Sequence, residues 1–267
     1  MNQAEAFLLE FHKHHPGCTR VAFAEGRCLE QGLSSYELLS SLASDDSVLD
    51  LGCGDGHLLS LLAKRALPTE PVGVDFSPDE LRAARLQRAD AVVAQGKAQQ
   101  LPFAEQSFSL VLSHFAFHLM SDLDVVVDEL ARVLKPAGRF AAIIGGGPKV
   151  DDTFELFLDL LSSYRRPERS VPSIGERRGR TKDGLANLFG NHQAFGDALD
   201  VKEYYVDFGG SFEEVWIRLS TIYDLMYFTE DEAMDLKETF RGRLNNNASD
   251  HIPCTMAIRR VIATRRP

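Results

Sequence analysis

The fold is decided by a short apolar segment that runs into glycines, Val48-Leu49-Asp50-Leu51-Gly52-Cys53-Gly54-Asp55-Gly56. Its first four residues are typical of a buried strand, and Leu58, Leu59 and Leu62 then follow with helical spacing. A strand, a tight glycine loop and a helix bring backbone N–H groups to the carboxyl edge of a sheet, where ligands bind in open α/β folds. The segment therefore predicts a ligand-binding loop.

The same unit repeats along the chain. Residues 71–75 are typical of a second strand, and Ser77 and Pro78 then give a good helix start. Further strands are predicted over residues 91–94, 107–113, 139–144, 201–208 and 255–264. Alternating strands and helices favour right-handed crossovers and a sheet covered on both faces. We predict an α/β fold with a seven-stranded, mostly parallel, doubly wound sheet and a helical insertion covering its ligand edge.

Composition narrows the classes of function. The 267 residues are 44% hydrophobic and 25% charged, as in soluble globular proteins. No apolar run is long enough for a membrane span, and a basic secretory start is missing, so we expect a cytoplasmic protein. The cysteines lie far apart, which argues against a zinc or redox motif. A formal charge of -10 disfavours nucleic acid and favours a small-molecule ligand.

The glycine loop has the pattern D-x-G-x-G-x-G from Asp50 to Gly56, which resembles the first motif of the Rossmann-like (class I) S-adenosylmethionine-dependent methyltransferases. A dinucleotide loop would need a glycine where this chain has His57. The resemblance implies S-adenosyl-L-methionine as cofactor, with Asp50 at its ammonium group and Asp75 at both ribose hydroxyls. It also places four loop residues and the residue after Asp75 against the cofactor, namely Gly52, Cys53, Gly54, Gly56 and Phe76.

A second match begins at Ala98-Gln99-Gln100-Leu101-Pro102-Phe103, which is similar to the segment D-A-x-x-L-P-F of the same family. The resemblance implies that Ala98 and Gln99 lie near the adenine. Lys97 stands where the family has an aspartate, and a lysine has no acceptor for the adenine amino group. Residues 129–139 are similar to a family helix and turn whose role is structural.

Candidate catalytic residues follow the strand over 107–113. His114 and His118 are candidate general bases because histidine titrates near neutral pH, or else they pack beside Phe115 and Phe117. Ser113 is expected to line the cofactor site. Tyr36 either covers the carboxylate of the cofactor, as in many relatives, or belongs to the core.

Three further features leave alternatives open. Residues 164–182 contain seven basic side chains, which either bind an acidic group of the acceptor or form a solvated loop. The helix predicted from Ser211 to Tyr227 carries an aromatic stripe that either roofs an acceptor pocket or is core. His12, His14 and His15 are expected on a solvated face, and no metal site is expected there.

These observations predict four parts, a helical cap over residues 1–45, a cofactor-binding half over 46–147, a helical lid over 148–198, and strands and helices that complete the sheet over 199–267. The expected function is methyl transfer to O, N or C of a small-molecule acceptor, with positioning supplying most of the catalysis. A non-catalytic S-adenosylmethionine-binding protein and an NAD-dependent oxidoreductase are the alternatives.

Overall fold

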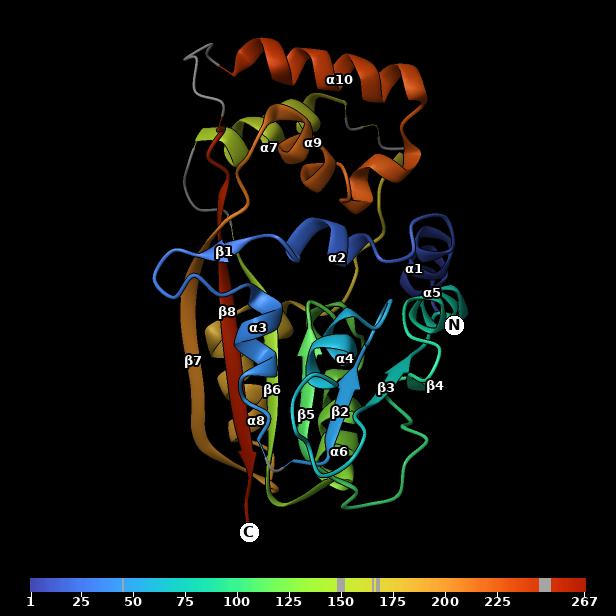
Figure 1. Ribbon diagram of the computed structural model, residues 1–267, viewed down its shortest axis with the longest axis vertical. Helices are drawn as coiled ribbons and strands as arrows, with labels where there is room; N and C mark the ends of the chain where they lie inside the picture. The colour runs from blue at the N-terminus through green and yellow to red at the C-terminus, as the bar shows by residue number, and fades with distance from the viewer. Residues whose placement is uncertain (45, 148–151, 165, 167–168, 245–250) are drawn as a thin grey trace.

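One mixed sheet runs through the molecule, with helices on both of its faces (Figure 1). The computed structural model describes residues 1–44, 46–147, 152–164, 166, 169–244 and 251–267. The strands follow the order β1-β7-β8-β6-β5-β2-β3-β4 across the sheet. Their bounds are β1 (Arg27–Cys28), β2 (Val48–Leu51), β3 (Val72–Asp75), β4 (Val92–Gln95), β5 (Phe108–His114), β6 (Leu134–Gly147), β7 (Phe195–Asp207) and β8 (Thr255–Arg265).

The strands from β2 to β6 pair in parallel, whereas β8 is antiparallel to both β6 and β7. All seven strands predicted from the sequence are confirmed. The sheet has an eighth strand, β1, in a region where the sequence predicts helix; it pairs Arg27 with Asp207 and Cys28 with Val206. Two residues are too few to show an alternating pattern in the sequence. Their strand conformation therefore depends on their pairing with the edge of β7.

Several helices begin at residues whose side chains satisfy free N–H groups of the first turn. Ser34 and Glu37 form a capping box at the start of α3, and Ser77 caps α5 with Pro78 in its first turn. Among the described residues, no helix is both long and apolar enough to cross a membrane. The bounds are α1 (Gln3–His14), α2 (Cys18–Phe23), α3 (Ser35–Ser40), α4 (His57–Leu62), α5 (Pro78–Gln87), η1 (Phe117–Leu119), α6 (Leu123–Val133), α7 (Asp152–Tyr164), η3 (Arg177–Arg180), α8 (Lys182–Gly190), α9 (Phe212–Leu219), η4 (Tyr223–Tyr227) and α10 (Glu230–Arg243).

The two faces of the sheet carry separate cores. On one face, Leu39 of α3 and Leu62 of α4 pack with the β5 side chain Leu112. On the other, α6 and α8 pack with alternate residues of the same strands, such as Val111. Because neighbouring residues of a strand point to opposite faces, strands with apolar residues at nearly every position are buried on both sides.

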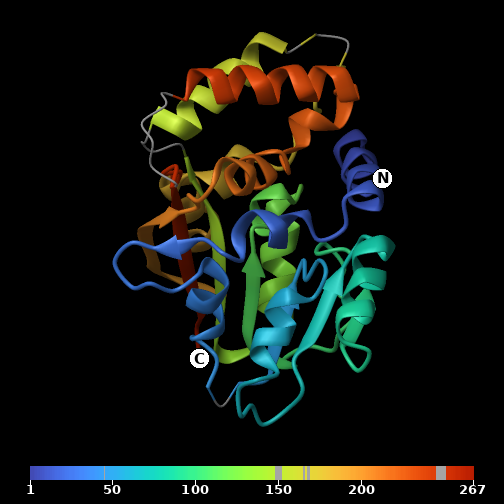
Figure 2. The ribbon, with the colours of Figure 1, turned by 45° about the horizontal axis from the view of Figure 1, so that its top comes forward.

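A layer of helices lies beyond the carboxyl ends of β2, β3 and β5, and it consists of α7, α9 and α10 (Figures 1 and 2). The sequence-based division differs from this arrangement in two respects. Helix α8, expected in the lid, packs on β7 and α6 because Leu185, Leu188 and Phe189 are buried in the sheet core. Helices α9 and α10, expected with the sheet, belong to the lid layer, where Phe240 packs on Phe157 of α7.

Candidate functional site

A cavity of about 450 Å³ opens at the carboxyl edge of the sheet, between the glycine loop, the ends of β3 and β5, and helix α1. Pro172, Ser173, Gly175 and Tyr223 of η4 close it from the lid side. Most residues predicted for the cofactor, and one predicted catalytic residue, meet in its wall: Tyr36, Asp50, Gly52, Cys53, Gly54, Asp75, Phe76, Ala98, Gln99 and His114. The topology therefore gathers residues that are up to 78 positions apart in the chain, from Tyr36 to His114.

The glycine loop needs backbone conformations that other residues rarely adopt. Gly52, Gly54 and Gly56 have φ angles of 74°, 52° and 78°. A Cβ atom on Gly52 would lie 2.4 Å from the Cβ of Ala116. Gly56 is the N-cap of α4 and is not among the residues that line the cavity. The glycines thus let the loop turn tightly beneath the cavity.

Asp50 is the last polar side chain of β2 and is 1% exposed. Neither of its carboxylate oxygens has a hydrogen-bond partner among the described residues. Burial raises its pKa well above the usual value, and the nearby carboxylates of Asp75 and Asp55 raise it further. A buried carboxylate without a partner is costly, so this position suits a cationic group or an ordered water beside it.

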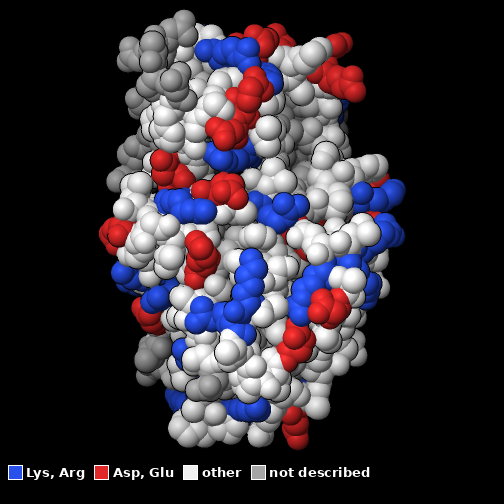
Figure 3. All heavy atoms as spheres, in the orientation of Figure 1, with Lys and Arg blue, Asp and Glu red and all other residues white. Residues whose placement is uncertain are grey.

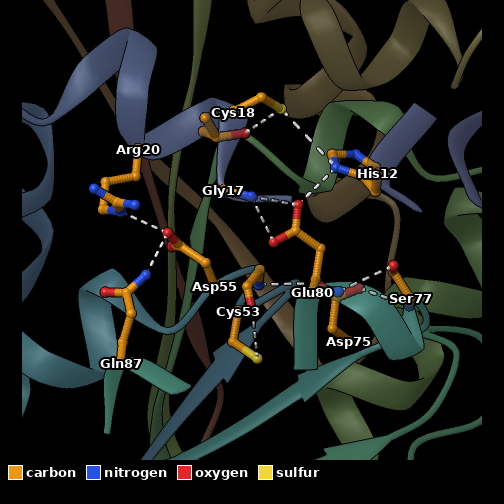
Figure 4. Close-up of polar contacts among 12 residues, drawn as sticks. His12, Gly17, Cys18, Arg20, Cys53, Asp55, Asp75, Ser77, Glu80 and Gln87 are labelled. Carbon is orange, nitrogen blue, oxygen red and sulfur yellow. Dashed lines mark hydrogen bonds and ion pairs between the residues drawn. The ribbon is translucent and has the colours of Figure 1, made fainter. Parts of the chain in front are cut away.

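Asp75 stands at the end of β3 and is held by two backbone donors (Figure 4). The N–H of Gly54 donates to Oδ2 and the N–H of Ser77 donates to Oδ1, each at 2.9 Å. Burial raises the pKa of Asp75, although both of these hydrogen bonds lower it. Each oxygen keeps a lone pair for a further donor, which is what a pair of hydroxyl groups requires.

Lys97 stands where the family that this chain resembles has an aspartate, and its contacts explain the lysine. Its Nζ atom lies 2.8 Å from both carboxylate oxygens of Glu5 in α1, so this lysine pairs with the helix that covers the cavity. The Nε2 atom of Gln99 donates to the carbonyl of Ser121 at 2.7 Å, which leaves Oε1 as the acceptor of that amide.

Residues 129–139 have the structural role expected of them. Glu129 accepts a hydrogen bond from the N–H of Leu101 at 2.6 Å, and Arg132 donates to the carbonyls of Leu101 and Phe103. Helix α6 thus holds the segment that follows Gln99.

His114 is buried and makes contacts with α3. Its ring stacks on Tyr36 with centroids 3.5 Å apart, and its Nε2 atom lies 2.9 Å from the Oγ of Ser35. Its Nδ1 atom has no partner among the described residues. Burial lowers the pKa of His114 well below the usual value, with His57 and His118 adding to the effect, so the ring is neutral at pH 7. Tyr36 fits both of its interpretations, since it is 4% exposed and also lines the cavity.

The other two residues predicted near the end of β5 lie outside the lining of the cavity. Ser113 is fully buried, and its Oγ has no partner among the described residues. Burial lowers the pKa of His118 to about 3, with a smaller effect from Arg180, and its Nδ1 atom is likewise unpartnered in the described structure.

Helix α1 contributes to the site in a way that the sequence analysis missed. Asn2, Glu5, Leu8 and His12 line the cavity. The expectation of a solvated histidine face is wrong for His12, whose Nδ1 lies 2.7 Å from Oε1 of the buried Glu80. Burial lowers the pKa of His12, but hydrogen bonds with Cys18 and Glu80 outweigh this and raise it to about 10. The apolar positions Phe7, Leu8 and Phe11 were the available signal that one face of α1 is covered.

Three of the six described basic residues of 164–182 pair with carboxylates. Arg166 and Arg169 bind Glu232, and Arg178 binds both Asp124 and Glu176. Arg165 lies outside the described residues. Acidic and basic side chains also alternate over the face shown in Figure 3. These three arginines fit the interpretation of a solvated, charge-balanced segment, whereas Arg180 donates to the carbonyl of Ile174.

The helix predicted from Ser211 to Tyr227 is interrupted. Helix α9 ends at Leu219, and the separate turn η4 begins at Tyr223. The break divides the aromatic stripe, because Trp216 packs on Phe157 in the core while Tyr223 lines the cavity. The core interpretation therefore holds for Trp216, and, in the part of the chain that the structure describes, only Tyr223 of the stripe reaches the cavity.

Comparison with known proteins agrees with this architecture. Residues 49–142 match the family model described as a methyltransferase domain. The uncharacterized methyltransferase YcgJ of Bacillus subtilis is 29% identical over 246 residues, covering 88% of this chain and 90% of that protein. The fatty-acid O-methyltransferase of Mycolicibacterium smegmatis is 39% identical over 95 residues, only 35% of each chain.

Solved structures show the same fold. The crystal structure of YcgJ aligns with 87% of this chain and 97% of that chain, with a TM-score of 0.53 and 22% identity. The BH2331 protein of Bacillus halodurans C-125 aligns with a TM-score of 0.58 and 19% identity, over 87% of this chain and 99% of that one. The glycine loop, the sheet and these matches together support a class I S-adenosylmethionine-dependent methyltransferase.

Proposed function

We propose that the cavity binds S-adenosyl-L-methionine and that the protein methylates an uncharged small molecule. The observation that carries this proposal is the pair of buried carboxylates in one wall, Asp50 with neither oxygen partnered and Asp75 with spare acceptor capacity. The first suits the ammonium group of the cofactor, directly or through a water, and the second suits the ribose diol. Phe76, Ala98 and Gln99 then flank the adenine, and Oε1 of Gln99 is the acceptor that Lys97 cannot supply.

The cofactor supplies a sulfonium methyl group that a nucleophile displaces in line. The protein's part is to hold the acceptor within about 3 to 3.5 Å of that methyl group and to exclude water. The cavity is suited to this task because its lining includes the mostly apolar side chains of Leu119, Met120, Pro172 and Tyr223. A general base is needed only for an acceptor that keeps its proton at neutral pH.

The charges of the cavity favour an uncharged acceptor. Among its acidic side chains, Glu5 pairs with Lys97, Asp55 with Arg20, and Glu80 with His12. The remaining two, Asp50 and Asp75, are assigned to the cofactor. An acceptor carboxylate or phosphate would therefore meet more negative than positive charge, and an acceptor ammonium would compete with the cofactor for Asp50.

Within this proposal His114 is a positioning residue. Its lowered pKa makes the ring a weak proton acceptor, and its Nδ1 atom is shielded from solvent. Through Ser35 and the stacked ring of Tyr36 it instead fixes α3 against the end of β5.

Two measurements test the proposed function. Calorimetry with S-adenosylhomocysteine and, separately, with NAD identifies the cofactor, and we expect heat of binding only from the first. Incubation with a methyl-labelled cofactor and a metabolite extract then tests transfer, with label expected in an uncharged product. Binding without transfer to any extract would instead favour a non-catalytic S-adenosylmethionine-binding protein.

A further inference from the structure

Three side chains with metal-binding atoms converge where the N-terminal helices meet α5 (Figure 4). They are His12 of α1, Cys18 at the start of α2 and Glu80 of α5. Their ligand atoms all lie within 4.8 Å of one another. Cys18 and Glu80 are buried, with 8% and 3% of their surface exposed.

From this convergence we propose a zinc-class metal site formed by His12 Nδ1, Cys18 Sγ and one oxygen of Glu80. Imidazole, thiolate and carboxylate are the ligands that Zn²⁺ takes in proteins, and three protein ligands with an open fourth position are typical of its accessible sites. His12 and Glu80 also line the cavity, so water or a cavity ligand can fill the fourth position.

The distances require only small side-chain movements. Ligand atoms around a tetrahedral Zn²⁺ lie about 3.3 to 3.7 Å apart, given bonds of about 2.0 to 2.3 Å. Here His12 Nδ1 lies 2.7 Å from Glu80 Oε1 and 3.9 Å from Cys18 Sγ. The first pair shares a proton in the present arrangement, and a metal ion takes the place of that proton.

Two details distinguish this cluster from a catalytic triad and from a chance meeting of ligands. Cys18 and Glu80 both approach the same ring nitrogen of His12, whereas a proton relay uses the two nitrogens on opposite sides of the ring. The Glu80 carboxylate is oriented by the N–H of Gly17, which donates to its two oxygens at 3.1 and 3.0 Å. A hydrogen bond that orients a ligand in this way is common around metal ions.

The test uses the full chain with Co²⁺ as a spectroscopic probe and Zn²⁺ as the competitor. We expect one equivalent of Co²⁺ to give a thiolate-to-metal absorption band that Zn²⁺ abolishes. The band should be lost in Cys18→Ser, and the affinity for Zn²⁺ should fall by at least about 100-fold in His12→Gln and Glu80→Gln, because loss of an outer-shell partner alone costs about 10- to 100-fold. His14→Gln and Cys28→Ser are matched controls that should bind as the parent does, and circular dichroism checks that every variant is folded.

The proposal is overturned if the parent chain binds no equivalent of either metal, or if a folded Cys18→Ser retains the band. Either result would identify the cluster as a hydrogen-bonded ion pair with a neighbouring thiol. The titration contains no cofactor, so its outcome is independent of the proposed methyl transfer.

Discussion

Lys97 and Glu5 are 92 residues apart in the chain, yet the lysine Nζ lies 2.8 Å from both oxygens of the glutamate. The pair joins the segment after β4 to α1 and accounts for a lysine at a position where the family has an acceptor for adenine. It is partly exposed, with 47% of the Lys97 and 18% of the Glu5 side chain accessible.

Replacement of Lys97 by Ala should therefore change stability slightly and cofactor affinity very little. A pair of this exposure contributes about 0.5 kcal/mol to the free energy of unfolding. A double-mutant cycle with Glu5→Gln measures that coupling. Calorimetry with S-adenosylhomocysteine should give an affinity within about threefold of the parent, and a loss of about 1.5 kcal/mol or more would mean that Lys97 contacts the cofactor.

Asp75→Asn should weaken binding of S-adenosylhomocysteine by about 1.5 to 3 kcal/mol, because the ribose hydroxyls would lose an ionised acceptor. The amide oxygen of Asn can still accept one of the two backbone hydrogen bonds, so the fold should persist. Asp79→Asn, at a partly buried neighbouring position that does not line the cavity, is the matched control. Equal affinities for the two variants would show that the ribose does not lie at Asp75.

The buried carboxyl group of Asp50 should make the free protein sensitive to pH. Its folded pKa is raised above the ordinary value of 3.8, so its contribution to stability is full below that value and declines as pH rises through the folded pKa. Binding of an ammonium group selects the ionised form. The affinity for S-adenosylhomocysteine should therefore rise with pH through the same range.

Calorimetry from about pH 5 to about pH 8 measures this dependence. Asp50→Asn should bind more weakly and remove the part of the pH dependence that comes from this carboxyl group. A parent whose affinity is constant with pH, or a dependence that is unchanged in the variant, would contradict the assignment of Asp50 to the ammonium group.

His114→Gln and His114→Ala separate positioning from proton transfer. The glutamine can preserve the hydrogen bond to Ser35, so kcat/KM should stay near the parent value, whereas the alanine should lower it about 10- to 100-fold through misplacement of Tyr36. The pH profile of kcat should show no histidine step near pH 6.5 in the parent. A step in the parent that both variants abolish would identify His114 as the base.

Gly52→Ala should destabilise the protein by at least about 1 kcal/mol, because its φ of 74° costs roughly that much for a residue with a Cβ, before the contact with Ala116 is counted. Gly242 is the matched control: it lies within α10, and an added Cβ would meet nothing within 4 Å. Alanine there should stabilise the protein by about 0.4 to 1 kcal/mol. Denaturant unfolding of both variants measures the difference, and two equal effects would show that the loop tolerates a side chain.

The sequence by itself determined the sheet and the end of the cavity that we propose to hold the cofactor. Strands β2, β3 and β5 are short apolar runs that carry Asp50, Asp75 and His114 at or next to their carboxyl ends, and the carboxyl ends of parallel strands meet at one edge. Their order in the chain is enough to bring these residues together. The conformation of the glycine loop could also be predicted from the sequence, because its backbone angles depend on the residues that form the loop.

Only the tertiary structure decided what lies across the cavity from that edge. The pairing of Lys97 with Glu5, the burial of His12 beside Glu80 and the place of Tyr223 all depend on how α1 and the lid pack onto the sheet. The sequence also did not determine which surface α8 and α9 pack on, since each helix has an apolar stripe that fits either the sheet or the lid. An amphipathic pattern states that one face of a helix is covered, and only packing decides which surface covers it.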